Sequence, residues 1–276
     1  MTDPSVIGRD SLVGVRVAIS VSESADLARL GLTPKHCELV VAEVVRAIII
    51  AGGTVVYGGR LKPEGFTRIF LEEAGRFRNK TEAVELCVSQ TEFSALKVKK
   101  LSLIDQRLGS AGKLTLLDAA GNPVRLSEVA ELDADAIDPG ASLTAMREYV
   151  SSSTAARVVG GGKRAGYLGS EPGVIEEARL SAAAGAQLYI AGGYGGAAAA
   201  LLSTVDASLF EWAPPGFPLD VANDDVVAAL ERFSRVFSQA KQNSLDSRET
   251  QLLAASHRPA DIATIVVRGL SMSREI

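Results

Sequence analysis

The chain has 276 residues, a formal net charge of −4 at pH 7, a pI of about 5.4 and a mean hydropathy of +0.17. No apolar run approaches the roughly 18 residues of a membrane span, and the acidic balance disfavours a general nucleic-acid-binding surface, which needs clustered cations. The amino terminus lacks a basic region followed by a long apolar core, so we expect no secretory signal, no membrane association and a cytoplasmic location.

The first ninety residues alternate between β-branched runs and helical patterns. VRVAISV is typical of a buried strand, and a Thr-Pro start followed by apolar residues at helical spacing is typical of a helix. Strands are predicted at 15–21, 54–57 and 83–89, and helices at 33–51 and 63–76. Alternation of this kind with short links predicts a parallel sheet covered by helices.

The second half repeats the alternation after a stretch, 91–150, that is harder to order. There LTLLDAAGNPV predicts a strand and a turn, and SLTAMREYVSSS predicts a helix, with their arrangement left open. Further strands are predicted at 156–161 and 186–193, and further helices at 172–185 and 195–205. We expect an α/β fold: a Rossmann-like, doubly wound, mainly parallel sheet of five to seven strands with helices on both faces.

Three prolines in WAPPGFP end this pattern. We place a boundary there, with a nucleotide-binding domain over 1–215 and a C-terminal helical extension over 216–276. Helices are expected in DDVVAALERFSRVFSQA and in the segment ending DIATIVVRGL. Neither is long enough to form a domain alone, so the extension is expected to pack on the same domain or on a dimer partner.

Cysteine and histidine are too sparse to suggest redox or metal chemistry. Cys37 and Cys87 lie far apart in apolar runs, which predicts buried reduced thiols rather than a disulfide. His36 and His257, the two histidines of the sequence, are also far apart. A histidine-based metal site or catalytic triad therefore has little support, and no metal is expected.

Glycine or serine clusters follow four of the predicted strands. In an open parallel sheet, ligands bind at the carboxyl ends of the strands, and a glycine turn before a helix can present backbone amides to a phosphate. Close packing of a helix on its strand would need the same glycines, so each cluster alone also fits a purely structural turn. Neither the dinucleotide fingerprint GxGxxG at the first strand nor a Walker motif is present.

Taken together, the clusters predict one ligand site at the carboxyl edge of the sheet. GYGGAAAALL is the most suggestive segment, because small residues in its first turns should leave the helix amides open. Arg60 and Arg164 are candidates for phosphate contacts, and Tyr194 for stacking on a base or for packing over the sheet edge. The predicted ligand-binding residues are Ser20, Ser22, Glu23, Gly58, Gly59, Arg60, Gly161, Gly162, Arg164, Gly192, Gly193, Tyr194, Gly195 and Gly196.

The motifs VVYGG, GGGK before PGVIEEA, and IAGGYGGAA resemble the SLOG superfamily over roughly residues 14–205. This superfamily unites the DprA/SMF DNA-processing proteins, the LOG nucleoside-phosphate hydrolases and ligand-sensing domains of immune effectors. The resemblance implies a Rossmann-like sheet that binds nucleotides or nucleotide-derived signals, including ADP-ribose derivatives, without a required cofactor.

The closer likeness is to SLOG domains that accompany TIR or other NAD-consuming modules in antiphage systems. Carried over to this sequence, it implies that Lys163 meets phosphate and that Glu176 or Glu177 holds ribose hydroxyls. It also implies a homodimer and a TIR or other effector module as a partner. Lys163 and Arg164 also fit solvated loop cations, and acids in a first helical turn are favoured by the helix dipole alone.

LOG-type hydrolases resemble one another in a PGGxGTxxE segment, which AGGYGGAAAA matches here. Ala191 replaces the proline, Gly196 the threonine and Ala199 the glutamate, so the carboxylate that could assist departure of a base is missing. We therefore favour a sensor of an ADP-ribose-like or cyclic ADP-ribose-like ligand over an enzyme. The alternatives are a nucleoside 5′-monophosphate or NAD-related N-glycohydrolase, with Glu176 or Glu177 as the acid, and a DprA-like nucleic-acid-handling protein.

Overall fold

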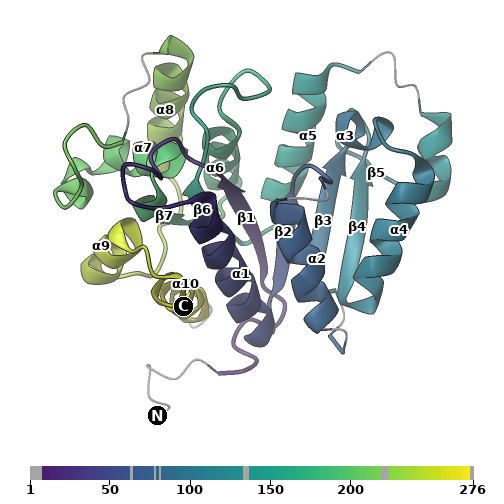
Figure 1. Ribbon diagram of the computed structural model, residues 1–276, viewed down its shortest axis with the longest axis horizontal. Helices are drawn as coiled ribbons and strands as arrows, with labels where there is room; N and C mark the ends of the chain where they lie inside the picture. Colours follow the sequence, from purple (N-terminus) through teal and green to yellow (C-terminus); the bar gives the residue numbers. More distant parts are fainter. Residues whose placement is uncertain are drawn as a thin grey trace.

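A computed structural model describes residues 8–62, 65–77, 79–80, 82–132, 137–218 and 223–273. Its described strands form one seven-stranded sheet in the order β5-β4-β3-β2-β1-β6-β7 (Figure 1). The strands are β1 (Arg16–Ser22), β2 (Thr54–Gly58), β3 (Val84–Ser89), β4 (Gly112–Leu117), β5 (Pro123–Val124), β6 (Ala156–Gly161) and β7 (Gln187–Ala191). Only β5 runs antiparallel to its neighbour within this described sheet.

Helices of ordinary length connect the strands, and those from Gly196 onward follow the last described strand. They are α1 (Pro34–Ile50), α2 (Phe66–Arg76), α4 (Val98–Leu108), α5 (Pro139–Ser152), α6 (Gly173–Ala183), α7 (Gly196–Val205), α8 (Asp224–Phe237), α9 (Ser247–Ala255) and α10 (Pro259–Met272), with a short α3 (Gln90–Ser94). The predicted start of the second helix at Pro63 lies outside the described residues. The α/β fold expected from the sequence is confirmed.

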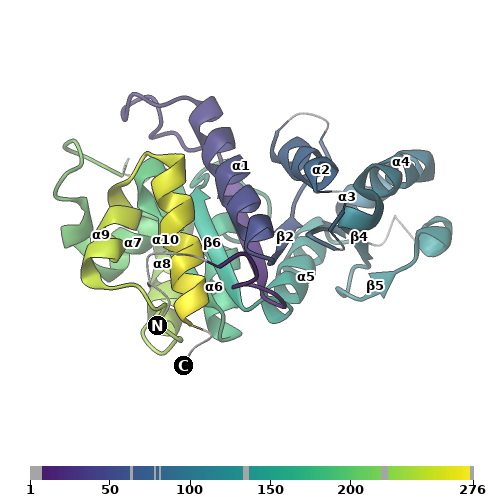
Figure 2. The same cartoon turned by 90° about the horizontal axis from the view of Figure 1, so that it is seen from below.

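Helices cover both faces of the sheet. On one face α1 packs against α2 and α10, which lie on either side of it (Figure 2). On the other face α5 packs against α6, and α6 packs against α8. The apolar residues that drive this packing are fully buried, as with Ile48 of α1 and Phe233 of α8.

The stretch 91–150 adds the outer part of the sheet. β4 pairs with β3, and a tight turn then returns the chain as β5, whose Val124 pairs with Leu116. Gly121 has φ +84° in this turn, a conformation that favours glycine, and the Asp118 carboxylate accepts hydrogen bonds from the amides of Ala120 and Asn122. The chain then enters α5, whose Met146 packs on Val56 in the middle of the sheet.

The C-terminal helices complete the two helical layers of the same sheet. Ile262 of α10 is fully buried in the core that α1 also joins, and a Cβ at Gly269 would lie 2.7 Å from the Tyr189 ring of β7. Asn243, between α8 and α9, donates from Nδ2 to the carbonyl of Leu188 at 2.7 Å and so covers the edge strand β7. The helix α9 is not among those predicted from the sequence.

Both cysteines are free and buried, as expected. Burial, with a smaller contribution from the Glu23 charge, raises the pKa of the Cys37 thiol to about 12. In the part of the chain that is described, no helix is both long enough and apolar enough to cross a membrane.

Candidate functional site

A pocket of about 430 Å³ opens at the carboxyl ends of β1, β2 and β6. The order of strands reverses at β1, because β2 lies on one side of it and β6 on the other. Such a switch point is where open α/β sheets bind ligands, and the volume falls in the range of small-molecule sites. The loops after β2 and β6, together with α5 and the start of α6, form its walls.

The β6 turn is shaped by its contact with the end of β1. Gly161 has φ +60°, and a Cβ there would lie 2.4 Å from the carbonyl oxygen of Ser22. That oxygen accepts a hydrogen bond from the amide of Gly162, and the Ser22 hydroxyl accepts one from the amide of Lys163 at 3.2 Å. The tight turn brings Lys163 to the pocket wall.

Helix α6 begins at the same wall. The amides of Ile175 and Glu176 both donate to the carbonyl of Pro172, so the amides of Gly173 and Val174 precede the first hydrogen bonds of the helix. Gly173 and Val174 line the pocket. The helix therefore turns its positive end, with two amides outside the helical ladder, toward the cavity.

The charged residues of the lining fall into a paired and an unpaired group. Arg60 pairs with Glu92 at 3.2 Å across the pocket. Lys62, Lys163 and Glu23 are lining residues that form no ion pair with any described residue. The pocket thus offers two lysines and one carboxylate to a ligand.

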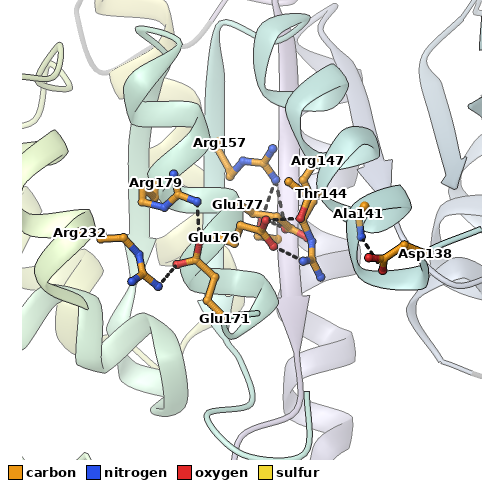
Figure 3. A network of polar contacts seen from close by, with 11 residues as sticks. Asp138, Ala141, Thr144, Arg147, Arg157, Glu171, Glu176, Glu177, Arg179 and Arg232 are labelled. Carbon is orange, nitrogen blue, oxygen red and sulfur yellow. Dashed lines mark hydrogen bonds and ion pairs between the residues drawn. The ribbon is translucent and has the colours of Figure 1, made fainter. Parts of the chain in front are cut away.

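Behind the lining lies a buried network of two arginines and two glutamates (Figure 3). Glu176, 1% exposed, accepts hydrogen bonds from Thr144 at 2.6 Å and from Arg147. Because these contacts occupy it and it does not line the pocket, Glu176 is part of the scaffold. It joins α5 to α6.

Glu177 is one of the two members of this network that reach the pocket, and Arg147 is the other. Its carboxylate pairs with Arg157 at 3.2 Å and with Nε of Arg147 at 3.6 Å, and it accepts a hydrogen bond from Ser20. Burial lowers the pKa of Arg157, and the Glu177 charge opposes that shift. These contacts fix the position of the carboxylate, and Ser20 acts through Glu177 rather than by lining the cavity.

Arg147 closes the network on the pocket side. It is 8% exposed and lines the cavity, and a Cβ at Gly173 would lie 2.5 Å from its Nη2. Its Nε is buried and has no hydrogen-bond acceptor among the described residues, although the Glu177 carboxylate lies within ion-pair distance. A buried donor without an acceptor is costly, and the nearby Glu177 carboxylate offsets part of that cost for Nε.

Aromatic and apolar groups supply the remaining wall. The Tyr57 ring stacks on Phe70, with centroids 4.3 Å apart, and a Cβ at Gly59 would lie 2.5 Å from that ring. Burial raises the pKa of Tyr57 and the Glu177 charge raises it further, so the hydroxyl stays protonated at neutral pH. Leu143 and Met146 of α5 complete an apolar surface.

The glycine turn after β7 differs from what its sequence predicts. A Cβ at Gly192 would lie 2.9 Å from the carbonyl oxygen of Ala254, and one at Gly193 would lie 2.4 Å from that of Ser256. These glycines therefore admit the carboxyl end of α9 rather than a ligand. Tyr194 is 1% exposed and donates from its hydroxyl to the carbonyl of His257 at 3.0 Å, so it packs and does not line the pocket.

The amides at the start of α7 are likewise already used, so the expectation that small residues leave them open is wrong. The Gly196 amide donates to the carboxylate of Asp26 at 2.6 Å, and the Ala197 amide donates to the carbonyl of Gly162 at 3.0 Å. Asp26 is fully buried and pairs with Arg164 at 3.4 Å. A carboxylate from the β1–α1 loop thus fills the anion site of this helix.

The predicted site residues consequently divide into three groups. Those that line the pocket are Ser22, Glu23, Gly58, Gly59, Arg60, Lys163 and Glu177. Those that shape or support it without lining it are Ser20, Gly161 and Gly162. Those that lie outside it are Arg164, Glu176, Gly192, Gly193, Tyr194, Gly195 and Gly196. That the lining residues bind a ligand stays a prediction.

Several lining residues were not predicted. Lys62 follows Arg60 by two residues in the same loop, and Tyr57 ends the strand before it, so proximity to a predicted cluster was an available signal. Arg147 had no such signal, because it lies on α5 in the stretch that could not be ordered. Among the described residues, no group of three or more His, Cys, Asp or Glu is placed to hold a metal ion.

The strand order, the two helical layers and the pocket at the switch point define a Rossmann-like α/β protein. The family model for SLOG cluster2 matches residues 11–252, and the chain therefore belongs to the SLOG cluster2 family. The match extends through α8 into α9, well past the boundary placed at residue 215. Comparison with curated proteins and with solved structures returned no match.

Proposed function

We propose that this protein binds a nucleotide-derived small molecule, ADP-ribose-like or cyclic ADP-ribose-like, in the pocket beside β1. The observation that carries the proposal is the convergence of Lys163 with the first amides of α6. Lys163 has no ion pair with a described residue, and the amides of Gly173 and Val174 precede the helical hydrogen bonds. A lysine together with a helix N-terminus facing a cavity favours a phosphoryl group.

Other parts of the lining suit the rest of such a ligand. The Glu23 carboxylate, which forms no ion pair with a described residue, can accept hydrogen bonds from a pair of ribose hydroxyls. Leu143 and Met146 offer an apolar surface to a planar base, and the Tyr57 hydroxyl, near Gly59, offers a donor. The lining thus matches phosphate, sugar and base with groups of fitting chemistry.

Glu177 supports N-glycosidic hydrolysis as a second candidate function. It is the glutamate of the predicted pair that reaches the pocket, so N-glycosidic hydrolysis of a nucleotide would use this carboxylate. Its contacts with Arg157, Arg147 and Ser20 favour a fixed hydrogen-bond acceptor over a group that delivers a proton. We therefore place binding first and hydrolysis second.

Calorimetry with AMP, ADP-ribose, cyclic ADP-ribose and NAD tests the proposal. We expect saturable binding of at least one of these ligands with one site per chain, and about tenfold weaker binding in Lys163→Met. Lys99→Met, which removes the same charge from the exposed face of α4, should bind like the native protein. Absence of binding by all four ligands would overturn the proposal.

Chromatography of the same mixtures separates binding from hydrolysis. Binding alone leaves the ligands intact over hours of incubation. Release of free adenine or nicotinamide that is lost in Glu177→Gln would establish the hydrolase instead. A salt-dependent mobility shift with DNA would revive the DprA-like alternative.

The biological setting rests on the family resemblance alone. We propose that ligand binding is reported to a TIR or other effector module in an antiphage system, and that the chain acts as a homodimer in the cytoplasm. Light scattering tests the dimer. A monomeric mass at micromolar concentration, with and without ligand, would contradict the proposed homodimer.

A further inference from the structure

The two lysines of the pocket that are without ion pairs among the described residues stand on opposite sides of β1. Lys62 lies in the loop after β2, and Lys163 lies in the loop after β6. Because β2 and β6 are the two neighbours of β1 in the sheet, their ends are separated by two strand spacings, roughly 10 Å. The loops that carry the two cations therefore lie on opposite sides of the carboxyl end of β1.

The two sides carry different amounts of anion-binding chemistry. On the Lys163 side, Gly173 and Val174 line the same cavity, and their amides precede the hydrogen bonds of α6. On the Lys62 side, the neighbouring guanidinium of Arg60 is already paired with Glu92. Lys62 is consequently the cation on that side which a ligand would meet unpaired.

From this arrangement we infer that the ligand carries a diphosphate that lies across the carboxyl end of β1. One phosphoryl group contacts Lys163 and the start of α6, and the second contacts Lys62. A ligand with a single phosphoryl group binds on the Lys163 side, where more donors converge. The inference rests on the proposed function, since it divides the same pocket into two unequal anion positions.

Two variants and two ligands test the division. AMP supplies one phosphoryl group and ADP-ribose supplies two, while the adenosine part is common to both. Lys62→Met should weaken ADP-ribose binding about tenfold and leave AMP binding unchanged, whereas Lys163→Met should weaken both about tenfold. Both lysines are exposed, so the variants are expected to fold, and their melting temperatures check this.

Lys99→Met is the matched control for loss of a positive charge, and it should bind both ligands like the native protein. The inference is overturned if Lys62→Met weakens AMP and ADP-ribose equally, because both lysines then clamp one phosphoryl group. It is also overturned if Lys62→Met changes neither. If native protein binds none of the tested nucleotides, the proposed function itself fails, a result distinct from either of these.

Discussion

Two turns of this protein are similarly rich in glycine, but one lies on the wall of a pocket and the other is packed against the rest of the chain. The turn after β6 ends at Lys163 on the wall of the pocket. The turn after β7 is closed by the end of α9 on one side and by the carboxylate of Asp26 on the other. α7 begins directly after the β7 turn, whereas a loop separates the β6 turn from the start of α6 at Gly173.

The helix that follows the β7 turn has its anion supplied from within the chain, whereas the start of α6 faces a cavity. In the β7 turn the anion is part of the chain, since Asp26 accepts from the Gly196 amide in a fully buried position. At the start of α6 the corresponding position opens into a cavity, and a ligand can supply the anion. Glycine content alone therefore does not distinguish an occupied site from an open one.

Gly196→Ala should give the largest effect on the closed turn. Gly196 has φ +63°, and a Cβ there would lie 2.2 Å from the carbonyl oxygen of Gly162. We expect a loss of more than about 4 kcal/mol in the free energy of unfolding, measured with urea. Gly185→Ala is the matched control, because Gly185 has φ +81° in open space and should lose only about 1 kcal/mol. Equal losses would show that the turn is not closed.

Removal of the internal anion should come next. Asp26→Ala takes away the partner of the Gly196 amide and leaves the buried Arg164 without this carboxylate, which predicts a loss of about 3 kcal/mol. Asp138→Ala is the control, since Asp138 caps α5 from an exposed position and should cost about 1 kcal/mol. If the two variants unfold at the same urea concentration, Asp26 does not have the role assigned to it.

The start of α6, which faces the pocket, can be disturbed without strain in the backbone. In Gly173→Ala the new Cβ meets the Arg147 guanidinium, which Glu176 holds in place, and the start of α6 is crowded. We expect ligand binding by calorimetry to weaken about tenfold, with a loss of stability below about 1 kcal/mol. Gly75→Ala on α2, where a Cβ meets nothing within 4 Å, should bind normally and gain about 0.5 kcal/mol. Normal binding by Gly173→Ala would contradict the proposal that the ligand binds at the start of α6.

Cys37, a buried residue of α1, reports on the packing of this helix in the core. Its pKa of about 12 means that the folded chain keeps a proton which the unfolded chain releases above about pH 8.5. Raising the pH from 8 to 10 therefore favours unfolding through this group. At pH 8 we expect no reaction of either cysteine with a thiol reagent in the folded protein and full reaction in urea. Rapid labelling of native protein would show that this region opens.

The strands and most helices could be predicted from the sequence because each depends on local periodicity, as in VRVAISV. The loops that end at Lys163 and Gly59 could also be predicted as site loops, since strand ends of a parallel sheet share one edge. The closure of the β7 turn could not, because it depends on Asp26, 170 residues away from Gly196, and on the end of α9. Arg147 was missed for the same reason, since its place in the pocket follows from tertiary packing of α5.

A crystal structure of the protein with ADP-ribose tests most directly whether the nucleotide binds at the start of α6. We expect ligand phosphate beside Lys163 and the amides of Gly173 and Val174, with the Asp26 carboxylate still on the Gly196 amide. Phosphate at the Gly196 amide with Asp26 displaced would contradict it, as would a ligand bound away from β1.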